Sequence, residues 1–146
     1  MKKLFTLITA VTMMALGSAT LTSCNDDQEI AYYLAGEWQG EITSVMTNER
    51  FNVTMFFDQN ANDYYSTSGT GYEVDWGWQG RSSRMAFTWY VRNRGIRINY
   101  QDRTRVIAEW DQLPYNANPG QRFSGYFVDW DTGETLAEFY LVKMGY

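Results

Sequence analysis

Histidine is absent from the 146-residue chain, and the chain holds a single cysteine. The lack of histidine excludes histidine-based catalytic triads, histidine general bases and histidine metal ligands. Basic residues are also few, since 12 Lys and Arg stand against 17 Asp and Glu and leave a formal net charge of −5. A nucleic-acid-binding surface needs Lys and Arg to neutralise phosphates, so this charge balance argues against a nucleic-acid partner.

No Gly-rich phosphate loop stands between a strand and a helix, so no nucleotide cofactor is predicted. Asp58, Asn60, Asn62 and Asp63 begin with the spacing of a calcium loop. The sixth position of such a loop needs Gly but here is Asp63, and the closing Glu is replaced by Gly69. These residues therefore predict a polar hairpin loop, and the sequence predicts neither a metal nor a cofactor.

The N-terminus carries the most specific motif in the chain. Lys2 and Lys3 precede an apolar stretch, residues 4–16, that is too short for a membrane-spanning helix. The segment Leu21-Thr22-Ser23-Cys24 then resembles a bacterial lipobox, in which the cysteine is lipidated. The sequence therefore predicts a lipoprotein signal peptide over residues 1–23. The alternative is an ordinary signal peptide followed by a chance cysteine.

Lipidation of Cys24 would leave no thiol for a disulfide, a zinc site or a nucleophile, since the chain has no other cysteine. It would also make the membrane a partner, because acyl chains contribute about 0.8 kcal/mol per buried CH₂. Residues 25–29 resemble the acidic export tag of Bacteroidota lipoproteins, although a solvated tether is the alternative. The predicted location is the cell envelope, as an outer-membrane lipoprotein that can be surface-exposed.

After this tether the apolar period becomes two, which is typical of half-buried antiparallel strands. Asp27 is expected to cap a short helix that Gly36 ends. The segment 64–76 is the least clear, because Gly69 and Gly71 suggest a bend or a bulge. The clearly alternating segments are 37–42, 51–58, 85–92, 96–101, 105–111, 123–128 and 136–144.

Short turns join these segments. Asn93-Arg94-Gly95 and Asp131-Thr132-Gly133 are hairpin sequences, although the second also spells the aspartic-protease triplet. About eight short strands with short links indicate a barrel or a sandwich. We favour an all-β, about eight-stranded antiparallel up-and-down β-barrel, because closure removes exposed strand edges. Such a barrel is either filled by side chains or holds one small ligand.

The segment Gly36-Glu37-Trp38, after a short helix, resembles the lipocalin signature. Lipocalins and their calycin relatives are eight-stranded barrels that bind small, mostly apolar molecules at the mouth. The resemblance implies that Trp38 closes the barrel floor, where the family packs an Arg over that ring; this chain offers Lys143 instead. The chain as a whole is similar to small lipocalin-like lipoproteins of Bacteroidota. The domains are then residues 1–23, a lipidated tether and helix over 24–34, and a barrel over 35–146.

Aromatic residues are frequent and supply the candidate binding residues. Inward-facing aromatics either line a ligand site or fill the core, and each contributes about 1.5–3 kcal/mol on burial. Trp76 and Trp78 flank Gly77 in an expected loop, so they are candidates for surface binding, with a barrel plug as the alternative. The candidate ligand-binding residues are Trp38, Phe57, Phe87, Trp89, Tyr100, Trp110 and Phe127.

Catalytic residue types are scarce, and no enzyme is predicted. A carboxylate-based hydrolase is the remaining alternative, and it would need a buried carboxylate pair with perturbed pKa values. Pairs two apart in the sequence, such as Glu73 and Asp75, usually belong to the solvated side of a sheet. The other such pairs are Glu109 with Asp111 and Asp129 with Asp131. The arginines at 92, 94, 97, 103 and 105 are expected to form cross-strand charge pairs.

Two classes of function remain. The first is a membrane-anchored binding lipoprotein that holds a small apolar or glycan ligand at the barrel mouth. It predicts a cavity lined by apolar side chains with a few polar groups. The alternative is a structural or accessory envelope lipoprotein, with a packed barrel that binds a protein partner through its surface.

Overall fold

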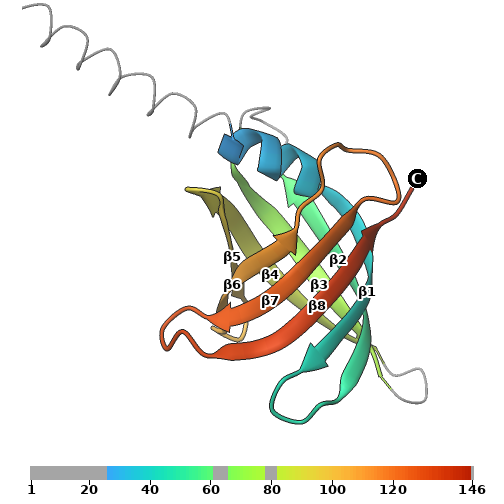
Figure 1. Ribbon diagram of the computed structural model, residues 1–146, viewed down its shortest axis with the longest axis vertical. Helices are drawn as coiled ribbons and strands as arrows, with labels where there is room; N and C mark the ends of the chain where they lie inside the picture. Colours follow the sequence, from blue (N-terminus) through green and yellow to red (C-terminus); the bar gives the residue numbers. More distant parts are fainter. Residues whose placement is uncertain (1–25, 61–65, 78–81, 146) are drawn as a thin grey trace, which may run out of the picture.

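The computed structural model describes residues 26–60, 66–77 and 82–145. The chain forms an all-β, closed barrel of eight antiparallel strands, in which each strand pairs with its neighbours in the chain and β1 pairs with β8 (Figure 1). This is the up-and-down barrel that the alternating pattern predicts. The strands are β1 Gly36–Ser44, β2 Arg50–Gln59, β3 Ser68–Trp76, β4 Ser82–Arg92, β5 Gly95–Tyr100, β6 Arg105–Gln112, β7 Arg122–Asp129 and β8 Thr135–Lys143.

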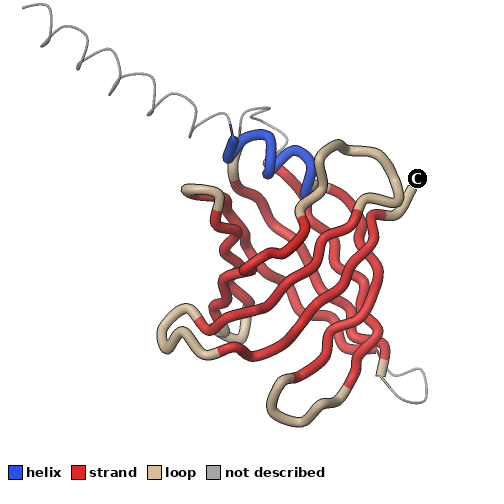
Figure 2. The backbone as a smooth tube through the Cα atoms, viewed as in Figure 1, coloured by secondary structure: helices blue, strands red, loops and turns tan. Residues whose placement is uncertain are grey.

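A short helix over residues 26–34 lies across one end of the barrel, beside the β6–β7 connection (Figure 2). The opposite end carries the β1–β2, β5–β6 and β7–β8 connections and is not covered by a helix. Within the described ranges, no helix has both the length and the apolar character needed to cross a membrane. The helix therefore closes one end, and a binding site at a barrel mouth belongs to the other.

Strand β3 corrects the expectation of a bend or bulge at Gly69 and Gly71. Both glycines lie within a continuously paired strand, opposite Trp89 and Phe87 of β4. A Cβ atom on Gly71 would lie 2.3 Å from the Phe87 ring and 2.3 Å from the carbonyl oxygen of Phe56. Glycine is present because the large rings of β4 occupy the space of its missing side chain. The register shifts lie elsewhere, in the β6–β7 and β7–β8 pairings.

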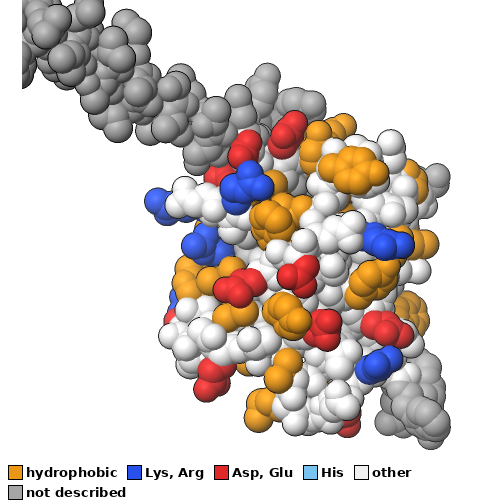
Figure 3. All heavy atoms as spheres, in the orientation of Figure 1, with side chains coloured by type: hydrophobic (Ala, Val, Ile, Leu, Met, Phe, Trp, Pro, Cys, Tyr) orange, Lys and Arg blue, Asp and Glu red, His pale blue; other side chains and the backbone are white. Residues whose placement is uncertain are grey.

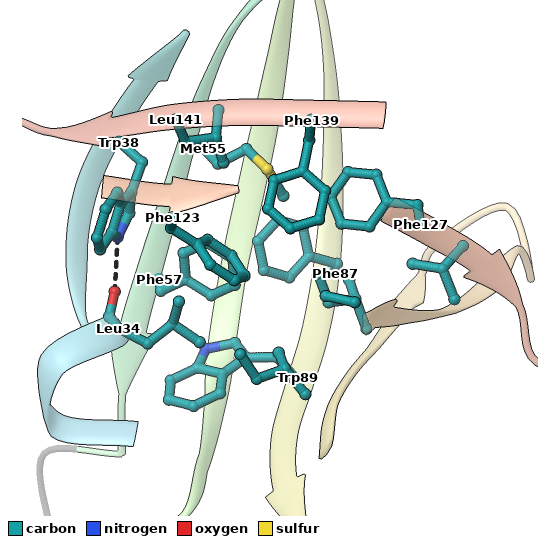
Figure 4. Close-up of a cluster of buried hydrophobic side chains, with 14 of the residues drawn as sticks. Leu34, Trp38, Met55, Phe57, Phe87, Trp89, Phe123, Phe127, Phe139 and Leu141 are labelled. Atoms are coloured by element: carbon teal, nitrogen blue, oxygen red, sulfur yellow. Dashed lines mark hydrogen bonds between the residues drawn. The ribbon is translucent and has the colours of Figure 1, made fainter. Parts of the chain in front are cut away.

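The inward-facing side chains fill the barrel (Figure 4). Phe57 packs edge-on against Trp89 at 5.8 Å between ring centroids, and Phe127 stacks on Phe139 at 4.5 Å. Close packing of this kind leaves little room for a guest deep in the interior. The largest fully buried side chains are Trp38, Trp89, Phe57, Phe123, Phe139, Leu34, Met55, Ile96, Ile98 and Leu141.

Trp38 seals the helix-covered end. Its indole Nε1 donates a hydrogen bond to the carbonyl oxygen of Leu34, at 2.7 Å, and so joins β1 to the helix (Figure 4). The Lys143 ammonium lies 5.4 Å from the Trp38 ring and donates to the carbonyl oxygen of Tyr33 at 2.6 Å. Lys143 thus makes the cationic contact with the tryptophan that the lipocalin resemblance predicts for an arginine. Burial of this side chain lowers the pKa of Lys143 to about 8.

Asp27 does not cap the helix as expected, because it lies inside the helix. Its buried carboxylate accepts hydrogen bonds from the backbone N–H groups of Asn93 and Arg94, at 2.8 and 2.6 Å. These two residues form the β4–β5 turn, with φ of 51° and 62°, values typical of a tight hairpin turn. The carboxylate therefore ties the helix to the barrel.

We expect Asp27→Ala to lower the free energy of unfolding by about 2 kcal/mol, because two backbone donors lose a charged acceptor. Asp26→Ala is the matched control. Asp26 forms an exposed ion pair with Arg94 at 2.7 Å, so its loss should cost less than about 1 kcal/mol. Urea unfolding curves measure both values. Equal losses of unfolding free energy in the two variants would contradict a stabilising role for the contact between Asp27 and the β4–β5 turn.

Candidate functional site

The barrel mouth opposite the helix holds a pocket of about 200 Å³. It opens where the inward-facing side chains of the strands reach the uncovered end. Six apolar side chains form most of its wall, and Glu73, Tyr100, Asp102 and Thr104 supply the polar groups. The apolar residues are Ile42, Met85, Val106, Phe127, Leu136 and Ala137. A mainly apolar wall with a few convergent polar groups is the usual composition of a small-molecule site.

Glu73 is the central polar group of this pocket. The strand alternation that points Gly69 and Gly71 inward continues to Glu73, so its carboxyl group is placed inside the barrel, where the side chain is 9% exposed. The Tyr100 hydroxyl, on β5, donates a short hydrogen bond to Glu73 Oε2. Strand β4 lies between the two strands that carry these partners, so the hydrogen bond spans β4 on the inner face of the barrel.

The pKa of Glu73 is raised from 4.5 to about 8, because the effects of burial and of the nearby Asp75 carboxylate together outweigh the lowering effect of the Tyr100 hydrogen bond, and burial is the largest cause. Burial and the same carboxylates also raise the pKa of the Tyr100 hydroxyl above its ordinary value. Glu73 therefore holds its proton at neutral pH. A neutral carboxyl group can donate as well as accept a hydrogen bond, and it places no buried charge against an apolar ligand.

The predicted ligand-binding residues separate into three groups. Phe127 and Tyr100 line the mouth pocket. Trp110 lies at the helix-covered end, where its indole donates to the carbonyl oxygen of Arg94 at 3.2 Å. The others are buried in the packed core and are not brought together around the mouth; they are Trp38, Phe57, Phe87 and Trp89.

Trp76 is the last residue of β3 and is 51% exposed on the outer surface. Trp78 and Cys24, the expected surface aromatic and lipidation site, lie outside the described residues. The mouth residues that the sequence analysis missed are mostly aliphatic, such as Ile42, Met85 and Leu136. The alternating pattern indicates that these side chains point into the barrel. It does not indicate that they lie at the open end, because that depends on which end the helix covers.

The Asp129–Asp131 motif and Arg105 have structural partners. Asp129 Oδ1 accepts from the N–H groups of Asp131 and Thr132, so this triplet is a hairpin turn as expected. Arg105 pairs with Asp131, and its guanidinium also lies 5.0 Å from the Trp130 ring. In the part of the chain that the structure describes, no group of three or more Cys, Asp or Glu residues is arranged to hold a metal ion.

We compared the chain with models of protein families, with curated proteins and with solved structures, and none of them matches. The barrel is compatible with a calycin-like fold on the basis of its own topology, an eight-stranded closed meander with a helix at one end. The chemistry of the site's own residues therefore carries the functional argument.

Proposed function

We propose that this protein is a membrane-anchored binding lipoprotein that holds a small, mainly apolar ligand at the open mouth of its barrel. The observation that carries the proposal is the mouth pocket, in which the neutral Glu73 carboxyl group and Tyr100 are set in an apolar wall. The apolar wall supplies the driving force for binding, and the polar pair orients a hydrogen-bonding group of the ligand.

The size of the pocket limits the ligand. A volume of about 200 Å³ corresponds to only about seven water molecules at about 30 Å³ each. Aromatic side chains such as Phe127 and Phe139 occupy the space below it. The proposed ligand is therefore a compact molecule, or one end of a longer molecule, and it carries no negative charge because the wall includes Glu73 and Asp102 and no basic side chain. Cys24 lies just before the helix in the sequence, so anchoring there would hold the helix-covered end nearest the membrane and leave the mouth facing away from it.

We expect Leu136→Trp to weaken binding of a small neutral probe, 4-ethylphenol, by at least tenfold, because the larger ring fills the rim of the pocket. Thr135→Trp is the matched control, since Thr135 is the exposed neighbour on the opposite face of β8. Ligand-observed NMR titration measures both dissociation constants. Binding should also weaken as pH rises towards about 8, where Glu73 ionises. Equal affinities in the two variants, or absence of any binding by the protein, would contradict the proposal.

The packed core favours a second candidate, the accessory lipoprotein that binds a protein partner through its surface. Trp38, Phe123 and Leu141 fill the core below the mouth and expose no surface themselves, since each is 0% exposed. This candidate predicts that blocking the mouth with Leu136→Trp leaves the biological activity unchanged.

The hydrolase alternative is tested at the same pocket. It required a buried carboxylate pair, and Glu73 beside Asp75 provides one buried member with a raised pKa. We favour binding, because Tyr100 and Asp75 already engage the Glu73 carboxyl group. Turnover of a glycoside by the protein that is lost in Glu73→Gln would support the hydrolase instead.

A further inference from the structure

A second site lies on the outer wall of the barrel and shares no lining residue with the mouth pocket. Strands β8, β1, β2 and β3 form a groove there of about 640 Å³, lined in part by Trp76 and Tyr140. Both rings are exposed, by 51% and 46% of their surface. The side chains between them are polar; they are Gln39, Glu41, Asn52 and Thr54.

The strand register places four of these residues in one row. Trp76 pairs with Asn52, Asn52 with Glu41, and Glu41 with Tyr140. Neighbouring strands lie about 4.8 Å apart, so the row spans about 14 Å along the sheet from Trp76 to Tyr140. Two aromatic side chains therefore stand at the ends of a polar strip.

The Trp76 ring is held over this strip. Its indole Nε1 donates a hydrogen bond to the Thr54 hydroxyl at 3.2 Å, across the β2–β3 pairing. Between the aromatic ends, the Glu41 and Asn52 side chains are exposed and make no side-chain hydrogen bond to another described residue. The groove thus combines an oriented aromatic face with polar groups that are open to a ligand.

From this groove we infer that the protein binds a short, uncharged oligosaccharide on its outer wall. Sugar rings have apolar C–H faces that pack on aromatic rings, and hydroxyls that pair with amide, carboxylate and hydroxyl groups. An apolar ligand would leave the polar strip unpaired. An anionic ligand would meet Glu41 and the acidic side chains that are spread over the adjoining β6–β8 face (Figure 3).

The larger groove on the outer wall, about 720 Å³ across β2 to β5, is less suited to this role. Its aromatic side chains, Phe56 and Tyr72, stack on each other at 5.4 Å. The Arg84 guanidinium also covers the Tyr72 ring at 4.0 Å. These faces are already occupied, whereas no aromatic or cationic side chain of the described residues is stacked on Trp76 or Tyr140.

Protein-observed NMR with cellohexaose, maltohexaose, mannohexaose and an acidic heparin hexasaccharide tests the inference. We expect at least one neutral hexasaccharide to shift the Trp76 indole N–H resonance. Trp76→Ala and Tyr140→Ala should each weaken that binding by tenfold or more. Tyr115→Ala, which removes an aromatic ring that is 75% exposed outside the groove, should leave it unchanged.

The inference is overturned if no neutral hexasaccharide binds, if only heparin binds, or if the three alanine variants behave alike. Sedimentation velocity of the same variants tests whether a second copy of the chain occupies the groove instead. A wild-type dimer that Trp76→Ala dissociates would assign the groove to that second copy. Leu136→Trp, which blocks the mouth, should leave glycan binding intact. The two sites can therefore fail or succeed independently.

Discussion

The stability of the protein is expected to fall as pH rises from about 5 to about 8, and Glu73→Gln is expected to remove this fall. Glu73 has a pKa near its ordinary 4.5 when unfolded and about 8 when folded. Within that window the folded state binds more protons than the unfolded state. The stabilising effect of the neutral carboxyl group is therefore fully present below about pH 4.5 and is lost as pH passes about 8.

The expected size follows from the width of the window. One proton changes the free energy of unfolding by at most about 1.4 kcal/mol per pH unit. Between pH 5 and pH 7.5 the free energy of unfolding of the wild type should therefore fall by about 3 kcal/mol relative to that of Glu73→Gln. Glutamine preserves the shape of the side chain and can still accept the Tyr100 hydrogen bond. Lys143, whose pKa is lowered to about 8, changes stability only at higher pH, where it acts with the opposite sign.

Guanidinium chloride unfolding of both proteins at half-unit pH steps measures the difference. Glu41→Gln is the matched control, because Glu41 is an exposed carboxylate on β1. Its stability profile should run parallel to that of the wild type. A carboxyl ¹³C titration then assigns the proton to Glu73 directly. Parallel profiles for Glu73→Gln and the wild type would mean that water enters the mouth and keeps Glu73 ionised at neutral pH.

The barrel could be predicted from the sequence because its rule is local. A period of two, broken by turn residues such as Asn93 and Gly133, specifies strands and their connections without knowledge of distant contacts. The role of Trp38 at the closed end was an expectation from the lipocalin resemblance, and Lys143 takes the cationic position beside it.

The site could not be predicted in the same way, because it depends on pairings between distant strands. Alternation showed that Glu73 and Asp75 share a face, but the solvated side was the more common choice for two acids. Gly69 and Gly71 show which face of β3 points inward, because the side chains of Trp89 and Phe87 occupy the space beside these two glycines. Glu73 lies on the same face of the strand and therefore also points into the interior. Likewise, only the register joins Trp76 to Tyr140 across four strands.

Gly71→Val is expected to destabilise the barrel by more than about 3 kcal/mol, at or above the upper end of core overpacking. A side chain at this position would meet the Phe87 ring and the carbonyl oxygen of Phe56, each 2.3 Å from a Cβ atom. Thr70→Val, on the exposed face of the same strand, is the control and should change stability by less than about 0.5 kcal/mol. Urea unfolding measures both variants.

A double mutant separates the two contacts of Gly71. Phe87→Leu removes the ring atoms but not the Phe56 carbonyl oxygen, so it should recover only part of the stability lost in Gly71→Ala. Full recovery of stability would show that the Phe87 ring alone accounts for the need for glycine at position 71. A Gly71→Val variant as stable as the Thr70→Val control would show that β3 bends or bulges here, as its glycine content suggests. The Glu73 side chain would then no longer point into the barrel, and the pKa of Glu73 would no longer be raised.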